Sequence, residues 1–319
     1  MQQFSFTDAF TGSAVTSSYP DLRSLVVESV SDLTACESVF FPGCSCINYA
    51  LPLVDAVYNT LKQAQSVEGI SLLCCGKILS FEENGEEKRA DFERVLREHM
   101  LQAGVKRIVT ACPNCTKALR ALLEADERSA HIQVVPLPLE LASLGYRVDA
   151  GVAREMLQRE VPELGAEAVF SPHDSCPDRE TGEFASGLRT LLENVNTAER
   201  KHNRAQSICC GSTPRAAGRM DAAERSAKLC GTESAQAGAQ AMVCACMSCA
   251  QLLTALATKM PCFHYLELLY NWRINWAAND GYMKLRFLFD DVLGAEVQGA
   301  SNRVFVPLDV VATSTDCEN

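Results

Sequence analysis

The chain has 319 residues, of which 47 % are hydrophobic and 22 % are charged, a composition typical of a globular protein with a buried core. Its formal net charge of −11 disfavours nucleic acid and anionic membrane surfaces as partners, because proteins that bind them usually carry basic patches. The N-terminus has neither the basic nor the apolar segment of a signal peptide, and no apolar run reaches about 18 residues. We therefore expect a cytoplasmic protein without a transmembrane segment.

The predicted elements alternate between short strands and helices. Residues 1–36 come first as an N-terminal arm, which we expect to be flexible in its small polar stretch at 13–18. Short apolar runs predict strands at 39–41, 70–73, 105–109, 168–170 and 241–243, and the single apolar residue Ile208 precedes Cys209. Helical patterns lie at 91–102, 116–125, 187–194, 220–229, 251–259 and 265–272. This order predicts an α/β fold of two pseudo-repeated βα domains, each with a small parallel sheet.

The cysteine motifs of the first half recur in the second half. The first half contains a single cysteine, a CCG motif and a CxxC motif: Cys44, Cys74-Cys75-Gly76 and Cys112-Pro113-Asn114-Cys115. The second half contains the same three in the same order: Cys176, Cys209-Cys210-Gly211 and Cys246-Met247-Ser248-Cys249. The offsets are 132 residues from Cys44 to Cys176, 135 from Cys75 to Cys210, and 134 from Cys112 to Cys246. Self-similarity at a fixed period indicates repeated structural units.

The main cysteine motifs follow the predicted strands. The carboxyl ends of parallel strands meet at one edge of a sheet, which is where open α/β sheets bind ligands. Three loops in each half can therefore bring five thiols together at the strand C-terminal ends. Gly76 and Gly211 would permit tight turns there. The alternative, that the cysteines merely cap buried strands, does not explain the duplicated spacing.

Five thiols in one place favour a soft metal. The chain has 16 cysteines, and clustered thiols in the cytosol usually bind metal or do redox work. Thiolates select iron–sulfur clusters, zinc or copper(I) over hard ions. Structural zinc and cubane clusters both take four ligands, so either one thiol in each half is spare or the cluster is an unusual one. Adjacent cysteines favour a polynuclear cluster, because neighbouring side chains diverge; a zinc-stabilised scaffold is the competing interpretation.

The doubled order of Cys, CCG and CxxC, spread over residues 39–271, resembles the cysteine-rich CCG-domain family, and within it the CCG-containing component of heterodisulfide reductase. The resemblance implies that each set binds a non-cubane [4Fe-4S] cluster through five cysteines. The first set would be Cys44, Cys74, Cys75, Cys112 and Cys115, and the second would be Cys176, Cys209, Cys210, Cys246 and Cys249. Cys46 is an alternative to Cys44, because the first interval is the shorter of the two, and Cys244 competes with Cys246.

The same resemblance implies an oxidoreductase: the iron–sulfur redox subunit of a heterodisulfide-reductase-like complex, which reduces a small disulfide by one-electron steps. The chain lacks the dense cysteine run of a ferredoxin domain. A ferredoxin-like iron–sulfur subunit and a flavin-containing subunit are therefore the expected partners. The alternative function is an electron-relay subunit of a lactate- or glycolate-type dehydrogenase complex, without substrate chemistry of its own.

The duplication also divides the chain. We predict a first CCG domain at 37–150, a second at 151–272, and a C-terminal extension at 273–319 that covers the domain junction or a partner.

Several polar residues and cysteines outside the two sets have competing interpretations. His173, three residues before Cys176, either donates a hydrogen bond or a proton at the site or is satisfied locally at a strand end. His264 is expected to connect a strand to a helix. Lys77, Arg215 and the acidic run at 81–93 are predicted to be solvated. The remaining cysteines are predicted to be small buried hydrophobic residues: Cys36, Cys230, Cys262 and Cys317.

Overall fold

The computed structural model describes residues 2–19, 25–28, 35–81, 83–257 and 260–276. These residues form two compact units. The first unit holds the described residues of Met1–Thr110 together with Asn114–Val135, and the second holds Ala111–Pro113 and Pro136–Trp276. Of the predicted C-terminal extension at 273–319, the part from residue 277 onward, with Cys317, lies outside the described residues.

The first unit is built on a four-stranded sheet with the strand order β5-β4-β6-β7. The strands are Ser38–Phe41 (β4), Gly69–Ile70 (β5), Arg107–Thr110 (β6) and Gln133–Pro136 (β7). β4 pairs in parallel with both β5 and β6, and its Val39, Phe40 and Phe41 are buried in the core. The helices of this half are Cys44–Gln63 (α1), Gly85–Gln102 (α2) and Pro113–Glu124 (α3), with a 3₁₀ turn at Lys77–Phe81 (η1).

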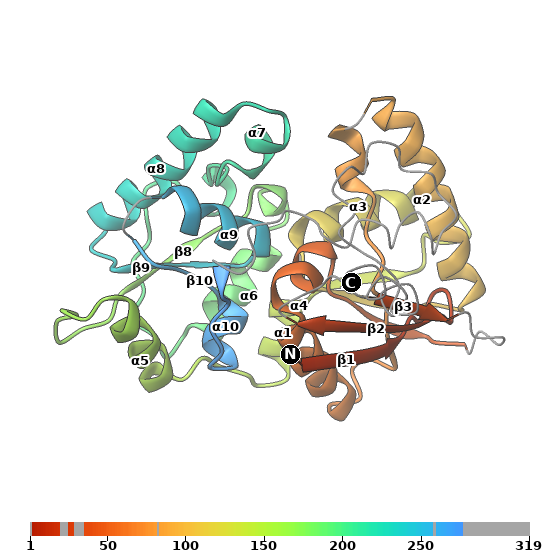
Figure 1. Ribbon diagram of the computed structural model, residues 1–319, viewed down its shortest axis with the longest axis horizontal. Coiled ribbons are helices and arrows are strands. Elements are labelled where there is room, and N and C mark those ends of the chain that lie inside the picture. Colours follow the sequence, from red (N-terminus) through yellow and green to blue (C-terminus); the bar gives the residue numbers. More distant parts are fainter. Residues whose placement is uncertain (1, 20–24, 29–34, 82, 258–259, 277–319) are drawn as a thin grey trace, which may run out of the picture. The chain divides into compact units, whose positions relative to one another are not determined.

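The second unit repeats this plan on a three-stranded parallel sheet with the order β10-β9-β8. Its strands are Phe170–His173 (β8), Ala241–Cys244 (β9) and Cys262–His264 (β10). Its helices are Leu137–Ser143 (α4), Ala150–Glu160 (α5), Glu183–Leu191 (α6), Ser212–Ala216 (α7), Met220–Gln236 (α8), Met247–Leu256 (α9) and Tyr265–Leu269 (α10), with 3₁₀ turns at Cys176–Asp178 (η2) and Arg204–Gln206 (η3). Figure 1 shows α8 and α9 above this sheet and α5 and α10 below it.

The predicted α/β class with two repeated parallel sheets is confirmed, and several element boundaries differ. The helix α1 was not predicted, because Pro52 and a non-helical Ala50 interrupt its periodicity. Both CxxC motifs lie further into helices than predicted, since α3 and α9 begin inside them. No strand precedes Cys209 among the described elements. Within the described part of the chain, none of the helices combines the length and the apolar character needed to cross a membrane.

The N-terminal segment forms strands in the part where we expected flexibility. Gln2–Thr7 (β1), Ala14–Tyr19 (β2) and Leu25–Glu28 (β3) form an antiparallel sheet. The prediction of flexibility at 13–18 is therefore wrong, because β2 pairs along its length with β1 and buries Val15.

Asp8 ties this N-terminal sheet to the segment that leads to Cys74. Its side chain is buried, and burial raises the pKa of its carboxyl group. One carboxylate oxygen accepts from the Phe10 amide at 2.9 Å. The other accepts from the Leu72 amide at 2.7 Å and from the Ser71 hydroxyl at 3.0 Å. Because these donors surround both oxygens, the carboxylate fixes the path of the chain two residues before the first CCG motif.

Replacing Asp8 with asparagine is expected to lower the free energy of unfolding by about 2 kcal/mol, because the new amide group must face a buried N–H donor in either orientation. Urea denaturation followed by circular dichroism measures this loss. Asp91→Asn is the matched control, since Asp91 is exposed on α2 and its change should stay within about 0.5 kcal/mol. Equal stability of the two variants would contradict the proposed role of Asp8.

Candidate metal centre

The five cysteines of the second set lie together. Cys176 opens η2 three residues after β8, Cys246 caps the N-terminus of α9, and Cys249 lies in the first turn of α9. Successive hydrogen bonds between thiols link the set in the order Cys176, Cys209, Cys210, Cys249, Cys246. The structure thus brings the five predicted ligands of the second half to one place beside the carboxyl ends of β8 and β9.

The paired-cysteine turn is held by backbone and hydroxyl contacts. Gly211 has a positive φ of 109°, and its amide donates to the Cys209 sulfur at 3.3 Å. The Cys210 thiol donates to the Ser212 hydroxyl at 3.3 Å, and that hydroxyl donates to the Ser248 carbonyl at 3.2 Å. Ser212 therefore connects the CCG turn to the CxxC loop, which fixes the separation of their sulfurs.

The thiols of this set share their protons unequally. Hydrogen bonds from Cys176 and Cys210 lower the pKa of the Cys209 thiol below its ordinary value, although burial opposes them. The same bond to Cys209 raises the pKa of Cys176, and the bond between Cys209 and Cys210 raises the pKa of Cys210 to about 12. Hydrogen bonds to Cys210 and Cys246 raise the pKa of Cys249. Cys209 is thus the most acidic thiol of the group, and metal binding would release the protons of its neighbours.

His173 lies against this set at the end of β8. Its ring and the sulfurs of Cys210 and Cys249 offer atoms within 4.8 Å of one another. Neither ring nitrogen has a hydrogen-bond partner among the described residues, and both are buried, which favours a role of His173 at the site over local satisfaction. Burial and the nearby Arg200 lower the pKa of His173 to about 3. A neutral imidazole facing buried sulfurs can donate to, or ligate, a bound metal centre.

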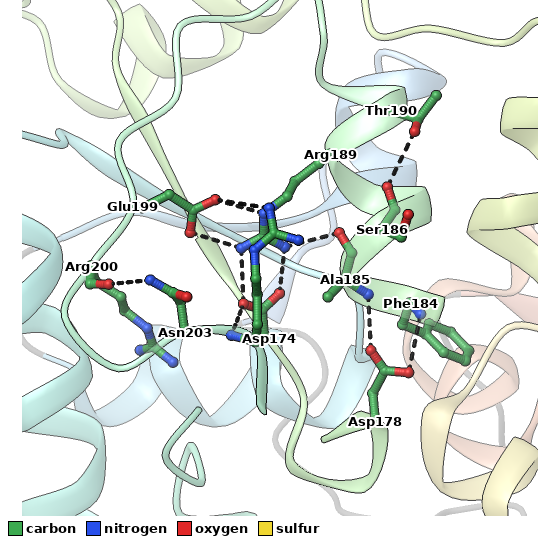
Figure 2. Close-up of polar contacts among 11 residues, drawn as sticks. Asp174, Asp178, Phe184, Ala185, Ser186, Arg189, Thr190, Glu199, Arg200 and Asn203 are labelled. Carbon is green, nitrogen blue, oxygen red and sulfur yellow. Dashed lines mark hydrogen bonds and ion pairs between the residues drawn. The ribbon is translucent and has the colours of Figure 1, made fainter. Parts of the chain in front are cut away.

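The loop that carries Cys176 is anchored on both sides (Figure 2). Before it, the Asp174 carboxylate accepts from Arg189 through both oxygens at 2.8 and 2.9 Å and from the Arg204 amide at 2.6 Å. After it, the Asp178 carboxylate accepts from the amides of Phe184 and Ala185 at the start of α6. The backbone around Cys176 is therefore fixed by buried carboxylates on either side.

Replacing Arg189 with glutamine is expected to destabilise the protein by about 2 kcal/mol, because it leaves the buried Asp174 carboxylate without its bidentate partner. Burial raises the pKa of Asp174, but the Arg189 bonds outweigh it and hold that pKa below 3.8. The contribution is accordingly present above pH 3.8 and is lost as the pH falls through the folded pKa. Urea denaturation at about pH 7 and about pH 3 measures both effects. Arg128→Gln, at an exposed ion pair, should change little, and a loss as large as that of Arg189→Gln would contradict the prediction.

Three cysteines of the first set also lie together. The Cys74 thiol is hydrogen-bonded to the thiols of Cys44 and Cys75, and burial together with these bonds raises its pKa. Cys44 is the first residue of α1, and Cys46 is buried two residues further on. Gly76 has a positive φ of 73°, and a Cβ atom there would lie 2.6 Å from the Phe92 ring. The glycine of this motif is therefore required both by its backbone conformation and by the close approach of α2.

The CxxC motif of the first half begins with a cysteine that contacts the second set. The Cys112 thiol is hydrogen-bonded to Cys246 of the second set, and this bond raises the pKa of Cys246. Cys115 is buried in the first turn of α3. The structure therefore places Cys112 against the second set, and the assignment of Cys112 and Cys115 to the first cluster stays a prediction.

The remaining polar residues and cysteines behave largely as expected. Cys36, Cys230 and Cys262 are buried, which confirms their predicted character. The Cys244 sulfur lies 3.3 Å from that of Cys262, whereas Cys246 contacts Cys249. His264 ends β10 directly before α10, as predicted. Lys77 and Arg215 are exposed, and so are several acidic side chains of the run at 81–93: Glu83, Glu86, Glu87 and Asp91.

Arg200 was not recognised as a site residue from the sequence. Its side chain is buried, with 1 % of its surface exposed, and it influences both His173 and Cys230. It lies in a polar stretch with other basic residues, where no pattern distinguishes it.

Comparison with known proteins identifies the family. The profile of a family described as a cysteine-rich domain, CCG, matches residues 38–120 and 170–254, which together exceed half of the chain. The chain belongs to the CCG cysteine-rich domain family. The two matched regions contain the two motif sets, so each half is a CCG domain. This membership gives the chain an iron–sulfur or other metal-binding redox role.

Other comparisons add no functional information. No curated protein matches the chain. Among solved structures it is similar to glutamate racemase RacE1 from Bacillus anthracis, with 14 % identity, a TM-score of 0.31, and coverage of 74 % of this chain and 78 % of that one. It is also similar to a putative Asp/Glu racemase from Yersinia pestis, with 13 % identity, a TM-score of 0.31, and coverage of 76 % and 98 %. Likenesses at these TM-scores carry no argument about this CCG protein.

Proposed function

We propose that this CCG protein is the iron–sulfur redox subunit of a heterodisulfide-reductase-like complex and reduces a small disulfide by one-electron steps. The observation that carries the proposal is the continuous set of five thiols in the second half, including the adjacent pair Cys209 and Cys210. Five thiols exceed the four that structural zinc requires. The doubled motif supports two such centres, each a non-cubane [4Fe-4S] cluster.

The residues of the second set fit such a cluster. All five donors are thiols, the ligand type that iron–sulfur clusters take. They are buried or half-buried, and the nitrogens of His173, which have no partner in the described part of the chain, lie near two of them. A cluster bound there would supply one-electron redox chemistry. The chain's own part is to hold the sulfurs through the Gly211 turn and the α9 N-terminus, and to keep the neutral imidazole of His173 available to donate a hydrogen bond to the centre.

The proposed reaction balances as one disulfide, two electrons and two protons giving two thiols. Electrons would arrive singly from a ferredoxin-like iron–sulfur subunit, itself served by a flavin-containing subunit. These partners remain part of the proposal, and they are supported by the absence of a ferredoxin cysteine run in the sequence.

The experiment uses the full chain, prepared and reconstituted without oxygen. We expect a brown protein with about eight iron atoms and as many acid-labile sulfides per chain, as for two [4Fe-4S] clusters. Protein reduced by methyl viologen should then be reoxidised by a small disulfide, with two thiols formed for each disulfide consumed. A colourless protein with stoichiometric zinc would overturn the metal assignment. Iron-loaded protein that reduces none of a panel containing cystine, glutathione disulfide and the methanogen heterodisulfide would overturn the reaction.

A further inference from the structure

Arg200 is a buried cation that has no ion-pair partner among the residues that the structure describes. Its side chain is 1 % exposed, and none of its three guanidinium nitrogens donates to an oxygen or nitrogen atom of the described residues. A guanidinium keeps its charge at any pH that a folded protein survives. Burying a charge is costly unless an opposite charge or hydrogen bonds compensate for it. The geometry around Arg200 therefore points to an anion that the carboxylates of the described residues do not supply.

The carboxylates that act on the same buried residues as Arg200, or that lie next to it in the sequence, have partners of their own. The pairs are Asp174 with Arg189, Glu199 with Arg189, and Glu233 with His202. In Figure 2 the only dashed line at Arg200 reaches its backbone carbonyl, which accepts from the Asn203 side chain at 2.7 Å. The guanidinium itself remains outside the hydrogen-bonded group of Asp174, Arg189 and Glu199.

The charge of the Arg200 guanidinium acts on two residues that contact the paired-cysteine turn, His173 and Cys230. Burial raises the pKa of the Cys230 thiol, and the charge and contact of Arg200 act against that shift. A neutral thiol is a weak acceptor, so Cys230 does not compensate the charge. The Cys230 sulfur in turn lies 4.0 Å from the Cys209 carbonyl oxygen. His173 experiences the charge of both Arg200 and Cys209, and it lies against Cys210. Arg200 thus acts on the paired-cysteine turn through His173 and Cys230, the two residues that contact it.

We propose that Arg200 is the buried counter-charge of the metal–thiolate centre formed by the second cysteine set and that it raises the reduction potential of this centre. The inference rests on the proposed function. A metal–thiolate centre becomes more negative when it accepts an electron, so a nearby cation in a medium of low dielectric constant favours the reduced state. Arg200 acts here as a positioning charge, since the structure gives it no contact with a ligand sulfur.

A counter-charge at the second centre makes the two centres unequal. Among the residues that the structure describes, Arg200 is the one arginine or lysine that is fully buried, and it lies in the second unit. The Cys44, Cys74 and Cys75 group has no counterpart of this kind within the described part of the first unit. The second centre is therefore expected to have the higher potential and to be reduced first.

The test compares three variants of the full chain, reconstituted anaerobically and titrated with dithionite while electron paramagnetic resonance spectra are recorded. Arg200→Gln removes the charge, Arg200→Lys retains it, and Lys201→Gln removes an adjacent exposed charge. In Arg200→Gln we expect the ratio of reduced to oxidised second centre at a fixed potential to fall at least about ten-fold, which corresponds to about 59 mV for one electron. The two other variants should stay near the wild type, as should the first centre. Cys210→Ser identifies which signal belongs to the second set.

The outcomes separate this inference from the proposed function. Wild-type protein without iron would overturn the proposed function. Iron-loaded Arg200→Gln with an unchanged potential would overturn the role of Arg200 alone. If Arg200→Gln does not retain its second centre, the melting temperatures of the metal-free variant and the metal-free wild type test the inference instead. The counter-charge role predicts that metal-free Arg200→Gln melts at or above the wild-type temperature, because it has lost an uncompensated buried charge. A lower melting temperature would show that Arg200 is structural and would overturn the inference.

Discussion

Replacing Cys210 with serine is expected to remove about half of the iron from the anaerobically reconstituted chain, from about eight atoms to about four. The Cys210 thiol is hydrogen-bonded to the thiols of Cys209 and Cys249, and His173 offers a ring nitrogen within 4.8 Å of its sulfur. A serine there interrupts the set in the middle. A hydroxyl is also a harder and far less acidic ligand than a thiol, so iron gains little from it. Iron and sulfide analysis measures the loss, and the electron paramagnetic resonance signal of one centre should disappear.

Cys36→Ser is the matched control for Cys210→Ser. Cys36 is also a buried thiol, and burial raises its pKa to about 11, but it lies outside both motif sets. Its serine variant should keep its full iron content. If Cys210→Ser kept about eight atoms as well, Cys210 would not be a ligand. If both variants lost iron equally, the loss would reflect unfolding rather than ligation, and the assignment of the second set would fail.

The repeated spacing predicted that the second set of thiols gathers beside the strand ends, because it places the thiols relative to the strands. Cys176 and Cys246 follow β8 and β9 within three residues, as the βα pattern implies. The glycine of each CCG motif was predicted to form a tight turn, and both Gly76 and Gly211 have positive φ angles. These features are local, so a single sequence contains them.

The features that were not predicted from the sequence depend on contacts between residues far apart in the chain. Asp8 joins the N-terminal sheet to Leu72, which is 64 residues away in the sequence. The contact of Cys112 with Cys246 lies within the second unit, whereas the duplication alone assigns Cys112 to the first set. Burial of Arg200 brings it to His173 of β8 and Cys230 of α8, and an isolated basic residue in a sequence gives no sign of this. The position of Arg200 near the second cysteine set can therefore be recognised only from the folded structure.

Gly211→Ala is expected to lower the free energy of unfolding by about 4 kcal/mol, combining backbone strain with overpacking. Gly211 has a φ of +109°, which L side chains rarely adopt. A Cβ atom would also lie 2.6 Å from the carbonyl oxygen and 3.0 Å from the Cα atom of Ala223. Since both atoms belong to the backbone of α8, the turn must move rather than the helix side chain. That movement would displace the Cys209 and Cys210 sulfurs, so the variant should also lose iron from the second centre.

Gly238→Ala separates backbone strain from the steric effect. Gly238 also has a positive φ, of 86°, but nothing lies within 4 Å of its added Cβ atom. This control should lose only about 1 kcal/mol and retain its iron. Urea denaturation of the metal-free chains measures the difference, and iron analysis of the reconstituted chains shows whether the turn has moved. Equal stability of the two alanine variants would mean that α8 yields at Ala223. In that case the close approach of α8 to the CCG turn would not be what holds the paired cysteines in place.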